Sequence, residues 1–196
     1  MINSGLKKQL ITTLILLVSV TAGFTQTDLE KLKERMLLEQ PTEKIYDYLN
    51  KSFPEVELAM LDGGTFNASD LLGKRVIVNF WFTNCQPCLD EMPILNDIQN
   101  ALGSEDYYFM AITFQDSLEV ANFLQSNDYN FNHVINARPL IDKLGVKFYP
   151  KTLILDENLQ VVKIEKGLPK EANTADLEKW KQALLEFLRS MSDDHK

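Results

Sequence analysis

A run of β-branched and aromatic residues from Val76 to Phe82 is the clearest hydrophobic pattern in the chain, and Asn79 is its one polar interruption. Such a run is typical of a central strand that is buried on both faces of a sheet. Shorter runs of similar residues predict further strands at 56–61, 108–113, 133–135, 152–155 and 161–165. The turn residues Asp156, Glu157 and Asn158 predict that the last two strands form a hairpin.

Apolar residues recur at helical spacing between most of these strands. Helices are expected at about 85–101, 117–126 and 139–144, and a last one from about 173 to 191. Alternating strands and helices indicate βαβ units, to which the hairpin adds antiparallel strands. The pattern therefore predicts an α/β domain over residues 53–192, with a mixed sheet that has helices on both faces.

Two shorter amphipathic segments precede this domain. Thr27 and Glu30 are spaced as a capping box, and a second short helix is expected from Thr42 to Leu49. Residues 26–52 are thus predicted to form a helical extension, which by its amphipathic character is expected to cover one side of the domain.

The first 25 residues have the layout of a secretory signal. Lys7 and Lys8 precede an apolar run from Leu10 to about Val20, and small residues follow it. The run with its small-residue tail is about 15 residues long, short of the roughly 20 that a spanning helix needs. We expect a cleaved signal peptide at 1–25 and a periplasmic or other extracytoplasmic protein, with an uncleaved membrane anchor as the alternative.

Composition and charge narrow the function. The chain is 45% hydrophobic and 24% charged, as in ordinary globular proteins, and its net charge of −8 opposes binding to nucleic acid or to an anionic membrane. The two cysteines, Cys85 and Cys88, close a loop too short to act as a structural staple. A zinc site needs more ligands than His133 and His195 add, so no metal is predicted, and His133 is expected at the surface of a strand or loop.

The position of the cysteine pair favours redox chemistry. Cys85 and Cys88 lie three apart where a buried strand is expected to end and a helix to begin. The unpaired N–H groups and the positive end of the helix dipole stabilise a thiolate at Cys85 and lower its pKa. Cys85 is then the nucleophile that attacks a disulfide, and Cys88 resolves the mixed disulfide.

Several motifs together resemble a known family. The sequence V-I-V-N-F-W leads into C-Q-P-C, E-M-P follows, and G-V-K-F-Y-P-K-T-L-I-L-D comes some sixty residues later. Over roughly Phe53 to Met191 the chain resembles the thioredoxin superfamily, and within it the TlpA/ResA-type exported thiol-disulfide oxidoreductases. The resemblance implies a thioredoxin fold, in agreement with the sheet and helices expected above.

The resemblance also implies substrate-binding residues. Tyr149-Pro150 matches the family's cis X–Pro bond, which lies against the active-site disulfide and leaves backbone groups of Tyr149 free to pair with a substrate strand. Trp81 matches a tryptophan beneath the active site. Two plainer readings stay open: Pro150 can simply begin an edge strand, and Trp81 can simply fill the core.

Proton transfer is the third implied feature. Ordinary thioredoxins have an aspartate where this chain has Asn79, an amide that does not titrate, whereas TlpA/ResA-type proteins place a glutamate at the position of Glu91. Glu91 follows Cys88 by three, so the two share a helix face, and the carboxylate is expected to accept the Cys88 proton. The alternative is a solvated helix glutamate like the neighbouring Asp90.

The function that follows is reduction of disulfides in exported proteins through a Cys85/Cys88 cycle with no bound cofactor. The resemblance implies substrates such as apocytochrome c and a membrane thiol donor. Asn84 replaces the tryptophan that many relatives carry, which leaves partner choice open. Two alternatives are a redox-sensing binding module and a peroxiredoxin-like peroxide reductase, although Thr83 is too close to Cys85 for the peroxidase motif.

Overall fold

The computed structural model describes residues 27–28, 30–31, 43–103, 106–168 and 173–193. The chain divides into two units, residues 1–42 and residues 43–196, and each is described by itself. In the first unit, the described residues Thr27, Asp28, Glu30 and Lys31 are helical. The signal peptide expected at 1–25 and most of the helix expected after Thr27 lie outside the described residues.

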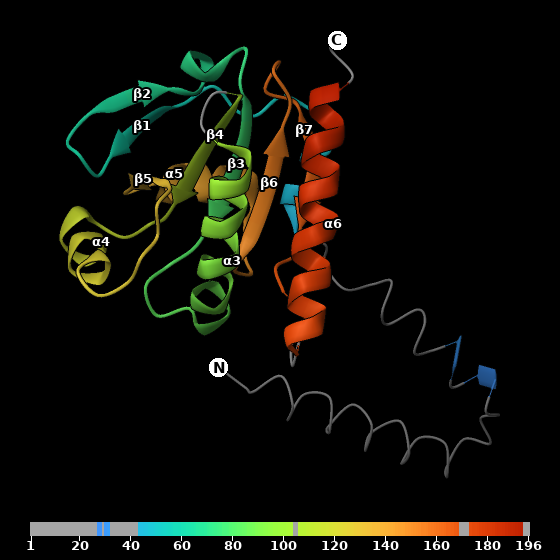
Figure 1. The fold of residues 1–196 in the computed structure, drawn as a ribbon. Coiled ribbons are helices and arrows are strands. Elements are labelled where there is room, and N and C mark those ends of the chain that lie inside the picture. Colours follow the sequence, from blue (N-terminus) through green and yellow to red (C-terminus); the bar gives the residue numbers. More distant parts are fainter. Residues whose placement is uncertain (1–26, 29, 32–42, 104–105, 169–172, 194–196) are drawn as a thin grey trace. The chain divides into compact units, whose positions relative to one another are not determined.

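The second unit is organised by a mixed sheet whose strands run in the order β2-β1-β5-β4-β3-β6-β7 (Figure 1). Strands β3, β4 and β5 are parallel to one another, and the remaining neighbours pair antiparallel. Their bounds are β1 Glu57–Met60, β2 Thr65–Asn67, β3 Arg75–Phe80, β4 Tyr107–Ile112, β5 Asn132–Ile135, β6 Lys151–Leu155 and β7 Val161–Glu165. This arrangement confirms the predicted α/β fold with a mixed sheet.

Helices cover both faces of the sheet. On one face, residues of α3 (Gln86–Leu102), α4 (Ser117–Leu124) and α6 (Thr174–Asp193) pack in one hydrophobic cluster. On the other, α5 (Arg138–Leu144) joins a second cluster with the short 3₁₀ helices η1 (Lys44–Tyr48) and η2 (Ala68–Leu71). Figure 1 shows α3 and α6 side by side, with α5 behind the sheet.

The central strand β3 explains this two-sided core. All of its residues are buried, and successive side chains alternate between the faces. Val76, Val78 and Phe80 enter the cluster with α5, whereas Ile77 enters the cluster with α3. By the same alternation, the polar Asn79 points to the α3 face, beneath the helix that carries the cysteines.

Some local features differ from the expectation. The strand β2 and the helix η2 were not predicted, because three or four residues are too few to establish a period. The short helix expected from Thr42 to Leu49 is a 3₁₀ helix over Lys44–Tyr48. Within the described residues, no helix is both long enough and apolar enough to cross a membrane.

Candidate active site

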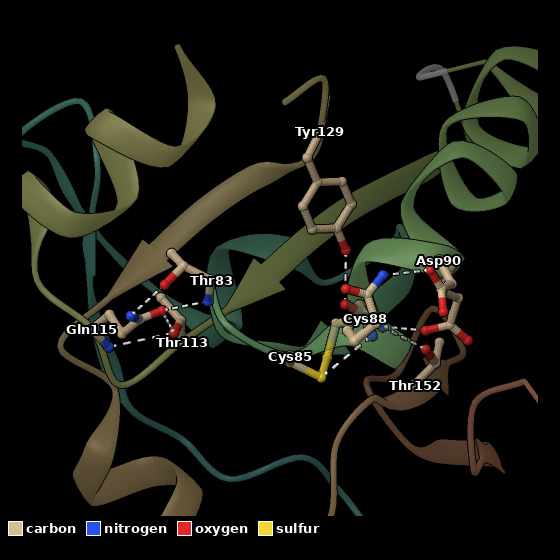
Figure 2. Close-up of a disulfide and its surroundings, with 11 residues drawn as sticks. Thr83, Cys85, Cys88, Asp90, Thr113, Gln115, Tyr129 and Thr152 are labelled. Atoms are coloured by element: carbon tan, nitrogen blue, oxygen red, sulfur yellow. Dashed lines mark hydrogen bonds between the residues drawn. A yellow bond between two sulfur atoms is a disulfide. The ribbon is translucent and has the colours of Figure 1, made fainter. Parts of the chain in front are cut away.

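The cysteine pair lies where β3 gives way to α3. Cys85 is the N-cap residue of α3, its sulfur is bonded to that of Cys88, and the two side chains are 4% and 2% exposed. The backbone N–H of Cys88 donates to Cys85 Sγ at 3.3 Å (Figure 2). A donor from the first helical turn is thus already directed at the sulfur that is expected to carry the thiolate charge.

Gln115, which no sequence motif indicated, fixes the loop that leads to Cys85. Gln115 accepts a hydrogen bond from the backbone N–H of Thr83 at 2.8 Å and donates one to Thr83 Oγ1 at 2.8 Å (Figure 2). Gln115 is 6% exposed and follows β4, the parallel neighbour of β3. The end of one central strand therefore fixes the loop that leaves the next.

Trp81 supports the site from inside the core. Its ring is fully buried and packs against Phe123, Tyr129 and His133, with ring centroids 5.1, 5.5 and 5.7 Å away. In this disulfide form the ring presents no surface to a partner, so any contribution of Trp81 to substrate binding goes through packing.

The prediction for His133 is wrong. His133 is 8% exposed and its Nε2 lies 2.9 Å from the carbonyl oxygen of Tyr129, because β5 is an interior strand between β1 and β4. Burial lowers its pKa, although the contact with the Tyr129 carbonyl raises it. A largely neutral imidazole therefore packs beside Trp81.

Glu91 lies on the buried side of α3 with 0% exposure, which excludes the alternative of a solvated helix glutamate. Burial raises the pKa of Glu91 to about 8; a hydrogen bond from Asn79 opposes the shift, and the charge of Glu165 adds to it. Glu91 Oε1 has no hydrogen-bond partner among the described residues. By contrast, Asp90 is exposed, as expected, and accepts a hydrogen bond from Gln86.

Asn79 connects Glu91 to two residues of other strands and loops. Its Nδ2 donates to Glu91 Oε2 at 3.3 Å and to Thr152 Oγ1 at 2.9 Å, while its Oδ1 accepts from the Tyr129 hydroxyl at 2.8 Å. Because the Tyr129 hydroxyl donates to Oδ1, the amide nitrogen faces Glu91. Tyr129 and Thr152 were not singled out from sequence, since they lie 50 and 73 residues from Asn79.

The Tyr149-Pro150 peptide bond is cis, which confirms this part of the expectation. The Tyr149 ring packs edge-on against Phe82, with centroids 5.3 Å apart, and Phe82 precedes Cys85 by three. Gly167 lies close behind Pro150, because a Cβ at Gly167 would come within 2.6 Å of Pro150 Cγ. The loop before β6 therefore belongs to the surroundings of the cysteine pair.

Asn84, next to Cys85, is exposed. The described part of the chain holds no group of three or more His, Cys, Asp or Glu side chains arranged to bind a metal ion. Glu91 is the buried titratable side chain on the helix of the cysteine pair, three residues after Cys88.

Comparisons with known proteins agree with this geometry. Residues 49–164 match the AhpC/TSA family. The thiol-disulfide oxidoreductase ResA of Geobacillus thermodenitrificans is 30% identical over 128 residues, which are 64% of this chain and 74% of that protein. ResA of Bacillus subtilis is 31% identical over 121 residues, 61% of this chain and 68% of that protein.

Solved structures share the fold. A putative thiol:disulfide interchange protein DsbE from Chlorobium tepidum superposes with a TM-score of 0.59 at 23% identity, covering 70% of this chain and 96% of that one. A putative protein disulfide isomerase from Bacteroides thetaiotaomicron has a TM-score of 0.58 at 20% identity, with coverage of 72% and 90%. At these identities the likeness concerns the fold alone.

Proposed function

From the premise that the chain belongs to the AhpC/TSA family and is a ResA-type thiol-disulfide oxidoreductase of the thioredoxin superfamily, we propose that it reduces disulfides of exported proteins. The observation that carries the proposal is the acid that follows Cys88 by three on α3: in the disulfide form, Glu91 is buried and has a pKa of about 8, which suits proton exchange with a thiol. A carboxyl group in that state holds a proton at neutral pH, as it would after taking one from a thiol.

The proposed cycle begins with the reduced pair. The Cys85 thiolate attacks one sulfur of the substrate disulfide, forms a mixed disulfide and releases the other substrate sulfur as a thiolate. The Cys88 thiol then passes its proton to the Glu91 carboxylate, and the Cys88 thiolate attacks Cys85 Sγ. The Cys85–Cys88 disulfide forms, the second substrate sulfur leaves, and two electrons have passed to the substrate.

Glu91 is suited to this proton transfer by its pKa. A thiol has an ordinary pKa of about 8.5, so a carboxyl group with a pKa of about 8 exchanges a proton with it at little free-energy difference. A solvated carboxylate with a pKa near 4.5 would be a far weaker base. Asn79, which donates to Glu91 Oε2, keeps this pKa below the value that burial alone would give.

The partners follow from the same premise. We propose that a substrate strand pairs with backbone groups of Tyr149 beside Pro150. The protein works outside the cytoplasm after a signal at 1–25 is removed. A membrane thiol donor then returns the cysteine pair to the reduced form. Apocytochrome c before haem attachment is one substrate class that fits. These assignments rest on the family and on the position of Tyr149 near Phe82.

Trapping tests the proposal. Replacing Cys88 by alanine leaves Cys85 free to attack but removes the resolving thiol, so exported substrates should accumulate as mixed disulfides on non-reducing gels. The matched variant Cys85→Ala retains one cysteine and should trap none. The wild-type protein should also catalyse reduction of insulin by a thiol donor.

The alternatives give different results. A folded Cys88→Ala protein that traps nothing, together with a wild-type protein that does not reduce insulin, would overturn the proposal. Consumption of peroxide without insulin reduction would point to a peroxide reductase. Partner binding that changes with the redox state, without either activity, would point to a sensing module.

A further inference from the structure

A second buried carboxylate lies beside the proposed substrate loop and has no part in the thiol chemistry. Glu43 is 5% exposed and Lys151 is 3% exposed, and Glu43 Oε2 lies 2.7 Å from Lys151 Nζ. Lys151 follows Pro150 directly and also donates to the Tyr46 hydroxyl at 3.0 Å. A buried ion pair therefore stands at the start of β6.

The other oxygen of Glu43 binds the loop backbone. Glu43 Oε1 accepts hydrogen bonds from the backbone N–H of Lys147 at 2.7 Å and of Phe148 at 2.9 Å. One carboxylate thus contacts residues on both sides of Tyr149-Pro150. We call Glu43 and its three partners Lys147, Phe148 and Lys151 the Glu43 clamp.

Glu43 comes from a segment outside the matched family region. It precedes η1, whereas the AhpC/TSA match begins at residue 49. The position of η1 is well fixed, because Ile45 is fully buried and a Cβ at Gly145 would come within 2.6 Å of Lys44 Cβ. The contact with Gly145 joins η1 to the end of α5, only two residues before Lys147.

The loop is therefore held from two directions. The Glu43 clamp fixes its backbone on one side, and the close approach of Gly167 to Pro150 confines it on another. A backbone segment that is ordered before binding does not lose that freedom when a substrate strand pairs with it, so binding is tighter.

We propose that Glu43 is a positioning residue for the substrate: it orders residues 147–151 so that the backbone of Tyr149 meets a substrate strand in one fixed orientation. The inference rests on the proposed role of Tyr149 and Pro150 in binding protein disulfides. It assigns to η1 and Glu43 a part in substrate recognition, beyond the covering role expected from sequence. Small disulfides and thiols, which need no strand pairing, should not depend on the clamp.

The test compares a protein substrate with a small thiol. The double variant Glu43→Met, Lys151→Met removes both charges together, so neither is left buried and unpaired, and it also removes the oxygen that accepts from the Lys147 and Phe148 N–H groups. We expect the KM for insulin to rise about tenfold with kcat within twofold of wild type. The rate at which dithiothreitol reduces the Cys85–Cys88 disulfide should also stay within twofold.

Two further variants keep the test decisive. Glu43→Asp retains the charge but draws the carboxylate back by one methylene, and it should raise the KM in the same way. Glu157→Gln breaks a different ion pair, with Arg75 at 2.6 Å, and should leave the KM unchanged.

An unchanged KM in folded Glu43 variants would overturn the inference, and so would an equal loss of the dithiothreitol reaction, which would mean general damage to the site. Failure of the wild-type protein to reduce insulin would instead contradict the proposed function itself.

Discussion

Glu91 and Glu43 are both buried carboxyl groups, one on the helix of the cysteine pair and one beside the Tyr149-Pro150 loop, yet their pKa values move in opposite directions. Burial raises the pKa of Glu91 to about 8, with only an amide, Asn79, to oppose it. Burial acts in the same sense on Glu43, but hydrogen bonds from Lys151 and from the backbone N–H groups of Lys147 and Phe148 lower its pKa below 4.5. Only Glu43 has a cationic partner and backbone N–H donors that favour the charged carboxylate.

The difference fits what each acid is proposed to do. Glu91 must gain and lose a proton near neutral pH, so a weak set of partners is an advantage. Glu43 must hold the loop at every working pH, so its charge has to be fixed. The two groups also affect stability with opposite signs. Glu43 contributes stability above its ordinary pKa that is lost as the pH falls, whereas Glu91 favours the folded state at low pH and loses this effect as the pH rises.

The largest effect on stability is expected when the charge of Glu43 is removed and Lys151 is left in place. Glu43→Gln leaves the Lys151 ammonium buried without its carboxylate, which should lower the free energy of unfolding by about 3 to 5 kcal/mol. Urea unfolding at neutral pH measures this loss.

Adding Lys151→Met to that variant should restore most of the stability, because no buried charge then remains unpaired. Equal losses in the single and double variants would show that the charge of Glu43 is not what distinguishes it from Glu91.

A smaller effect per pH unit is expected from the titrating acid. Between about pH 4.5 and pH 8 the unfolded chain has released the Glu91 proton while the folded disulfide form retains it. The free energy of unfolding should therefore fall by about 1 kcal/mol for each pH unit over this range.

The variant Glu91→Gln should remove this dependence of stability on pH. It should also slow resolution of the mixed disulfide about a hundredfold.

Urea unfolding at a series of pH values and stopped-flow kinetics give the two readouts. Asp90→Asn is the matched control, because it removes an exposed carboxylate from the same helix turn and should change neither. Kinetics that match wild type throughout the range would remove Glu91 from the proton transfer.

The smallest effect is expected from Tyr129→Phe. It leaves the buried Oδ1 of Asn79 without its donor and should lower stability by about 1 kcal/mol. Without the Tyr129 hydroxyl the amide of Asn79 is held only by Thr152 and Glu91, so its hydrogen bond to Glu91 should weaken. The pKa of Glu91 should then rise, and the upper limit of the pH-dependent range should rise with it.

Tyr107→Phe provides the comparison, since the buried Tyr107 hydroxyl donates to the Leu188 carbonyl on α6. It should reduce stability without moving the pH range. A pH range that stays fixed in Tyr129→Phe would mean that Asn79 does not need Tyr129 to face Glu91.

Local sequence was enough to predict the parts of the site that depend on short spacing. The run into β3, the C-x-x-C at the helix start and the Glu91 spacing are all set within a strand end and one helix turn. The family motifs added Tyr149 and Pro150. The roles of Tyr149, Pro150 and Glu91 came from the resemblance to the family, whereas the strand, the helix start and the shared helix face of Cys88 and Glu91 follow from period and spacing alone.

The residues that orient the site could not be predicted from local sequence. Gln115 lies 32 residues from Thr83, and Glu43 lies 104 residues from Lys147. Such pairs depend on strand order and on how loops pack, which no local pattern encodes. His133 was misplaced for the same reason, because only the position of β5 inside the sheet makes it buried.

The register of β6 ties the two acids together. Lys151 pairs with Phe80 and Thr152 with Asn79, so consecutive residues of one strand serve Glu43 on one face and the Asn79–Glu91 group on the other. A shift of β6 by one residue would move each of its side chains to the opposite face and bring an ammonium group toward Glu91, whose pKa would then fall below the range needed for proton exchange with a thiol. The length of the connection between Gly145 and Thr152 should therefore be less tolerant of change than most of its individual residues.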